Sequence, residues 1–208
     1  MILKWSGCRG EQPRQPTSPG DADPAQFDLT VGREYRCHAV AVFNGSVFAL
    51  ICDDTSLPWW YRMEQFTVTD GSISPSWKLG LHDRKYEGLQ MVTGYPAIAT
   101  DIDHYVGVIE RIPEEMEVFW RQTGIAGLVD QEFDAVVIEI LPSGCRVRLE
   151  NEEIGFLPNT KNQSWVDGDN TLAVNDSLRI VIVDAIQYPV GVSTLVLDID
   201  AARRGEKA

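Results

Sequence analysis

The stretch that decides the fold runs from residue 133 to residue 158 and reads FDAVVIEILPSGCRVRLENEEIGFLP. Residues 133–141 form a nearly continuous apolar run, which stops at Pro142-Ser143-Gly144. In the following CRVRL, apolar residues alternate with Arg146 and Arg148, which is the period of a strand with one buried face. A polar turn at residues 150–153 and a short apolar segment, IGFLP, complete the stretch. We therefore predict three consecutive strands with a glycine corner, which is how a small Greek-key barrel begins.

The chain after Pro158 supplies two more strands. Residues 159–173 are polar and rich in turn formers, whereas residues 178–186 are strongly β-branched and residues 192–199 are again apolar. Five strands with a longer connection after the third is the strand count of an OB barrel.

Residues 132–200 resemble the S1-type OB domain. The resemblance lies in the corner SGCRVRL, the return EEIGFLP, the Asn175-Asp176 entry to the fourth strand and Val183-Asp184 at its end. It implies an all-β five-stranded S1-like barrel that binds single-stranded RNA on the face of its second and third strands. The family usually carries aromatic or histidine side chains where this chain has Ser143, Arg146 and Pro158, whereas Asp184 matches the family pattern.

The expected nucleic-acid-binding residues are therefore Arg146, Arg148, Lys161 and Asp184. Arg146 and Arg148 are two positions apart on one strand, so they point to the same side and could contact phosphate or stack on a base. The acids of residues 150–153 lie on the same hairpin and oppose that role.

The N-terminal part has a different pattern. Residues 1–26 contain four prolines and no periodicity, which predicts a flexible arm. Residues 27–124 predict an α+β domain, an antiparallel sheet plus two short helices. Asn44-Gly45 marks a hairpin, and Pro96 and Pro113 mark the helix starts. Its segments GREYRCHAV, ALICDD and WKLG resemble small uncharacterised bacterial proteins, which implies no function.

The remaining segments connect or end these domains. We expect residues 125–131 to be a linker and residues 201–208 to be a charged tail.

Charge and composition favour a cytoplasmic globular protein. The 208 residues carry a net charge of -13, with -6 in residues 27–129 and -7 in residues 130–208. Such a field repels a phosphate backbone at long range and favours a basic partner, although acidity also serves solubility. There is no apolar run long enough for a signal peptide or a membrane span, and we expect no membrane association.

No catalytic or cofactor motif is present, so we expect neither an enzyme nor a cofactor. The four cysteines and three histidines are scattered, without metal-ligand spacing. Asp53-Asp54 is more simply explained as a strand-end turn than as a metal pair.

Two functions stay open. Trp59, Trp60 and Tyr61 follow Pro58 and could anchor a protein partner, although packing in the core is the simpler interpretation. With the acidic runs at residues 114–117 and 150–153, this segment suggests an immunity-like inhibitor of a basic toxin or nuclease. The first hypothesis remains a non-catalytic protein whose barrel binds single-stranded RNA or a protein.

Overall fold

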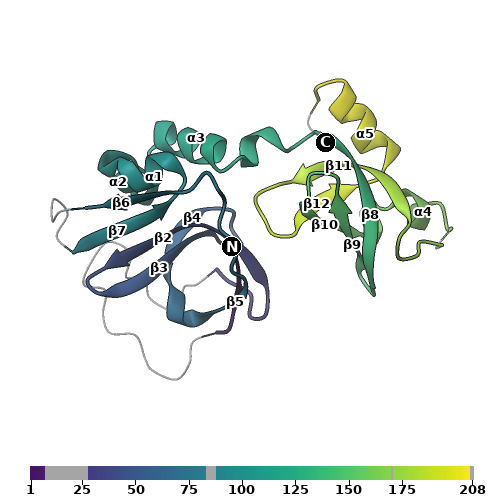
Figure 1. Cartoon of the computed structure of the whole chain (residues 1–208). Coiled ribbons are helices and arrows are strands. Elements are labelled where there is room, and N and C mark those ends of the chain that lie inside the picture. The colour runs from purple at the N-terminus through teal and green to yellow at the C-terminus, as the bar shows by residue number, and fades with distance from the viewer. Residues whose placement is uncertain (8–27, 83–87, 170, 207–208) are drawn as a thin grey trace. The chain divides into compact units, whose positions relative to one another are not determined.

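The computed structural model describes residues 1–7, 28–82, 88–169 and 171–206 (Figure 1). They divide into two compact units, Met1–Thr123 and Gly124–Ala208. Residues 125–131, expected as a linker, group with the second unit, and Ile125 is buried. Among the described residues, no helix is both long and apolar enough to cross a membrane.

The first unit is built on a seven-stranded antiparallel sheet. Its strands are β1 (Ile2–Trp5), β2 (Glu34–Phe43), β3 (Ser46–Cys52), β4 (Pro58–Arg62), β5 (Phe66–Asp70), β6 (Lys78–Leu81) and β7 (Leu89–Gly94). β2 is the shared strand, because it pairs with β3 on one side and with both β1 and β7 on the other. The turn at Asn44-Gly45 joins β2 to β3 with φ of 47° and 74°, which confirms the predicted hairpin.

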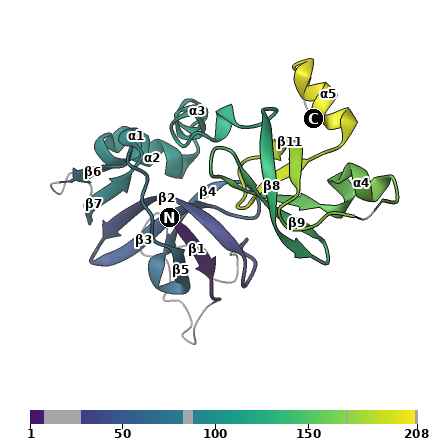
Figure 2. The ribbon, with the colours of Figure 1, turned by 45° about the vertical axis from the view of Figure 1, so that its right-hand side comes forward.

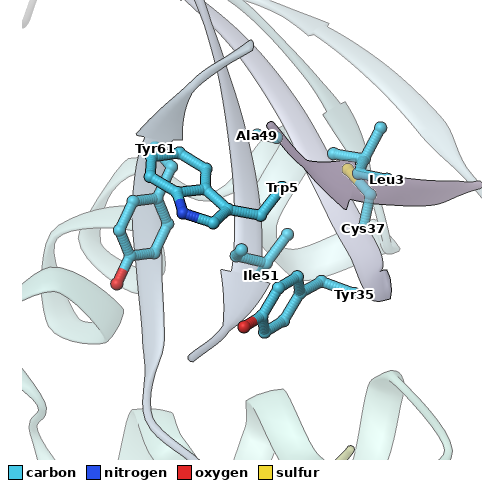
Figure 3. Packing of buried hydrophobic residues seen from close by; sticks show 7 residues of the cluster. All are labelled: Leu3, Trp5, Tyr35, Cys37, Ala49, Ile51 and Tyr61. Carbon is cyan, nitrogen blue, oxygen red and sulfur yellow. The ribbon is translucent and has the colours of Figure 1, made fainter. Parts of the chain in front are cut away.

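β1 corrects the prediction of an arm at residues 1–26. Residues 8–26 lie outside the described residues, but Ile2–Trp5 pairs with both β2 and β5. Leu3 and Trp5 point into a buried cluster with Tyr35, Ile51 and Tyr61 (Figure 3). The proline-rich composition of residues 1–26 predicts an arm, and a strand of four residues is too short to show an alternating pattern in the sequence. Its partners lie about 30 and 65 residues further along the chain.

Three helices lie on one side of this sheet, and the first of them contacts β6 and β7 (Figures 1 and 2). They are α1 (Pro96–Thr100), α2 (Ile102–Glu110) and α3 (Pro113–Gln122). The sequence predicted the first two as one helix. They separate at Asp101, whose extended backbone ends α1 and whose carboxylate accepts the amides of Asp103 and His104 to cap α2.

The second unit is a closed five-stranded barrel. Its strands are β8 (Glu132–Leu141), β9 (Gly144–Leu149), β10 (Ile154–Pro158), β11 (Ser177–Asp184) and β12 (Val190–Ser193), in the order β10-β12-β11-β8-β9. β10 and β12 run parallel, and all other pairs are antiparallel. This is an OB-like barrel, as predicted. Gly144 turns the corner between β8 and β9, where a Cβ would lie 2.1 Å from the carbonyl oxygen of Leu157.

Short helices flank the barrel: the 3-10 helix η3 (Ile125–Gly127), the 3-10 helix η4 (Asn159–Lys161), α4 (Gln163–Val166) and α5 (Val196–Arg203). The predicted last strand at residues 192–199 exists but ends earlier, at Ser193 of β12, and α5 takes up residues 196–203, where the rest of that strand and the start of a tail at residue 201 were predicted. α5 is held to the barrel by Arg203, which donates to the carboxylate of Glu132 at 2.6 and 3.0 Å. Arg179 donates to the same carboxylate.

Candidate nucleic-acid interface on the barrel

The outer surface of β9 and β10 carries Arg146, Arg148, Ile154 and Phe156, which we call the β9–β10 face. On β9, the residues that alternate with the arginines are buried, so both arginines point outward. On β10, Gly155 and Leu157 are buried, so Ile154 and Phe156 point outward as well. The sequence prediction that Arg146 and Arg148 share a side is confirmed.

Cross-strand pairing places these side chains in two rows. Arg146 lies opposite Phe156, and Arg148 lies opposite Ile154. Directly paired residues have Cβ atoms about 4.5–5.5 Å apart, so the first arginine borders the phenyl ring. The rows are two residues apart along each strand, which is about 6.6 Å.

The first row continues around the barrel. Phe156 pairs with Gly191 on β12, and Gly191 pairs with Asp184 on β11. Glu139 on β8 pairs with Arg146 at the other end. Because Gly191 has no side chain, this position of β12 does not cover the ring of Phe156 from that side.

The charge of this face is only partly neutralised within the barrel. The Nε of Arg146 lies 3.8 Å from the Oε2 of Glu139, and both side chains are substantially exposed. Such a surface pair contributes about 0–1 kcal/mol, so a phosphate could replace the carboxylate at little cost. Arg148 is exposed, and no carboxylate within the described ranges lies at ion-pair distance from it.

The other two predicted nucleic-acid-binding residues have partners of their own. The Nζ of Lys161 donates to the Oδ2 of Asp198 on α5 at 2.9 Å. Burial raises the pKa of Asp198, but hydrogen bonds from Ser193 and Lys161 outweigh it and hold the pKa below its ordinary value. Asp184 accepts the amide of Ile186 at 2.9 Å and stabilises the turn after β11. The structure therefore brings Arg146 and Arg148 together and leaves Lys161 engaged with α5.

Phe156 is the residue that sequence reasoning missed. At the positions where the S1 family usually carries its aromatic side chains, this chain has Ser143 and Arg146. The sequence does contain a signal for Phe156, because buried and outward-pointing residues alternate in IGFL as they do in CRVRL. Once the two strands are paired, Phe156 lies on the same side as the arginines.

The proposed partner anchor in the first unit is not exposed. Trp60 and Tyr61 are only 5% and 4% exposed. Trp60 packs against Tyr105 of α2, and Tyr61 belongs to the cluster around β1. β4 is thus covered on both faces, so neighbouring side chains are buried although they point in opposite directions. Trp59 is partly buried, with the Arg111 guanidinium 5.3 Å from its ring centroid.

The acidic run at residues 114–117 is also partly used inside the fold. The carboxylate of Glu115 lies 2.5 Å from the Nδ1 of the buried His104. The Nε2 of that imidazole lies 2.9 Å from the hydroxyl of Tyr95. Glu115 therefore joins α3 to α2, whereas Glu114 and Glu117 are exposed.

Asp53 and Asp54 end β3 as a turn. Asp53 accepts from the amides of Thr55 and Leu57, and Asp54 accepts from Arg33 and Tyr35. Within the described part of the chain, no group of three or more His, Cys, Asp or Glu residues could hold a metal ion.

Comparison with known proteins defines no family for this chain. No family model matches the chain, and no curated protein matches it. Among solved structures, it is similar to a multidomain protein with nucleic acid binding domains from Streptococcus pneumoniae TIGR4, at 14% sequence identity and a TM-score of 0.26. The match covers 77% of this chain and 51% of that one, so this chain spans about half the length of that protein.

Proposed function

We propose that this is a non-catalytic binding protein whose S1-like barrel binds single-stranded RNA on the β9–β10 face. The observation that carries the proposal is the pairing of Phe156 with Arg146, with Arg148 one row further along the same surface. An aromatic platform beside cations is the combination with which sequence-tolerant barrels bind single strands.

Each group has a distinct role in this proposal. The ring of Phe156 stacks on one base, which contributes about 1–3 kcal/mol. The two guanidinium groups contact successive phosphates and fix the register of the strand. Glu139 competes with phosphate for Arg146, and the net charge of -13 opposes long-range attraction, so we expect modest affinity.

The environment of Cys37 and His38 on β2 argues against a nucleophilic role for this cysteine. Burial raises the pKa of Cys37 to about 12 and lowers the pKa of His38 to about 3. At neutral pH, the thiol is therefore protonated and the imidazole is neutral. A nucleophilic cysteine needs the opposite, a thiolate stabilised by positive charge.

The test is fluorescence anisotropy of a mixed-sequence single-stranded RNA at about 50 mM and about 200 mM salt. Two phosphate contacts predict a slope of about -1.4 in log K against log salt, which is about a sevenfold loss of affinity over this range. The double variant Arg146→Ala/Arg148→Ala should bind more weakly and lose most of this salt dependence. Phe156→Ala should weaken binding but keep the slope, because the ring is uncharged.

The matched control is Arg121→Ala/Arg204→Ala, which removes the same charge from exposed helix ends. It should bind as the unsubstituted protein does. Equal effects of the two double variants would mean that general charge, rather than the β9–β10 face, determines binding. Absence of RNA binding at the lower salt concentration would overturn the proposal.

A further inference from the structure

A pocket of about 250 Å³ lies at one end of the barrel, between the β8–β9 corner and α4. Its lining includes the apolar residues Ile140, Cys145, Trp165 and Leu172 and the amide side chains of Asn159 and Asn162. The sequence pattern alone predicts no site at these residues.

Two of the apolar residues that line this pocket are exposed. Ile140 pairs with the buried Cys145 and therefore points toward the barrel interior, yet it is 48% exposed. Trp165 on α4 is 43% exposed. α4 therefore leaves this end of the barrel incompletely covered, with an indole among the side chains that line the opening.

Two side-chain amides add one hydrogen-bond acceptor and one donor to the lining. Asn159 donates its Nδ2 to the carbonyl oxygen of Pro142, so its Oδ1 is the end available as an acceptor. Asn162 is buried, and its Oδ1 accepts the amide of Ser164, so its Nδ2 is the end available as a donor. The lining therefore combines an aromatic ring, apolar contacts, one acceptor and one donor. A planar heterocycle with acceptors and donors on its edge matches this set, as an unpaired nucleobase does.

The pocket lies next to the strand ends that border the β9–β10 face. It begins at Gly144, which pairs with Pro158 at the end of β10, and Asn159 follows directly. Phe156 is three residues from Asn159, which is about 10 Å along the strand. A strand that stacks one base on Phe156 can thus place a neighbouring base at the pocket.

We infer that this pocket is a second base-binding site, in which an unpaired nucleobase of the bound RNA stacks on Trp165. The inference rests on the proposed function and adds a site outside the β9–β10 face. Trp165 acts here as an uncharged stacking group, and the two asparagines orient the edge of the base.

The same anisotropy titration tests the inference with three variants of the full chain. Trp165→Ala should weaken RNA binding about 5- to 150-fold, as expected for one lost stacking interaction, and should leave the salt slope unchanged. Trp165→Phe keeps a ring and should retain most of the affinity. Val166→Ala is the matched control, because Val166 is the next residue of α4, is exposed and does not line the pocket.

The outcomes separate this inference from the proposed function. Unchanged binding by Trp165→Ala, with weakened binding by Arg146→Ala/Arg148→Ala, would overturn the pocket and keep the interface. Equal losses in Trp165→Ala and Val166→Ala would assign the effect to the packing of α4 and would also overturn it. Absence of RNA binding by the unsubstituted protein would overturn both.

Discussion

Leu3 provides the most direct test of the first unit. Its side chain is 0% exposed and lies on β1, between β2 and β5. Leu3→Ala removes three buried carbon atoms, which costs about 2.4 kcal/mol at about 0.8 kcal/mol each. Since β1 is bonded on both edges, the surroundings can close the cavity only in part. We therefore expect a total loss of about 3–4 kcal/mol in the free energy of unfolding.

The assay is urea unfolding followed by tryptophan fluorescence in a Trp165→Phe background. Trp165 is the one tryptophan of residues 124–208, so the remaining signal reports on the first unit. The control is Leu81→Ala, at a leucine on β6 that is 77% exposed, with an expected change within about 0.5 kcal/mol. If Leu3→Ala is no more destabilising than this control, β1 does not pair in solution and residues 1–7 belong to an arm.

Two further predictions concern polar contacts. Glu115→Ala leaves the Nδ1 of the buried His104 without its partner and should lower the free energy of unfolding by about 1–3 kcal/mol, measured by urea unfolding. Glu115→Gln keeps an acceptor and should lower it by less. Equal losses of stability in the two variants would refute the hydrogen bond. Hydrogen bonds from Arg203, and then from Arg179, hold the pKa of Glu132 below its ordinary value of 4.5, so their stabilisation is complete above that pH and is lost as the pH falls through the lowered pKa. The melting temperature of the barrel should therefore fall below about pH 4.5, and less so in Glu132→Gln; an identical acid profile would contradict this.

The barrel was predictable because its signals are local. The alternation in CRVRL, the corner at Gly144 and the β-branched run of β11 each report on backbone geometry within a few residues. The hairpin at Asn44-Gly45 was predictable for the same reason, since both residues tolerate a positive φ.

The elements that sequence reasoning missed depend on distant partners. Ile2–Trp5 is a strand because β2 and β5 meet it from far along the chain. Val196–Arg203 contains enough apolar residues to suggest a strand, yet it is a helix, and its Arg203 reaches Glu132, 71 residues away. No window of a few residues contains that information.

The same distinction applies to the candidate site. A period of two was enough to predict that Arg146 and Arg148 share a side. The partner of Lys161 is 37 residues away, so its ion pair with Asp198 could not be read from the sequence. Phe156 was within reach of pattern reasoning, but only the register of β9 against β10 shows that it borders Arg146.

The acidity of the chain bears on the kind of nucleic acid that the proposed interface would select. In the barrel unit, Glu132 forms ion pairs with Arg179 and Arg203, and Asp198 forms one with Lys161. Much of the positive charge of this unit is therefore neutralised by its own carboxylates. Among the described residues, the β9–β10 face carries the two cations Arg146 and Arg148, and two phosphate contacts alone provide little affinity against a net charge of -13. Stacking must then supply most of the binding energy, and it requires bases that are not paired. A duplex presents a denser line of phosphates to the acidic surface and keeps its bases stacked inside, so this arrangement favours single strands over duplexes.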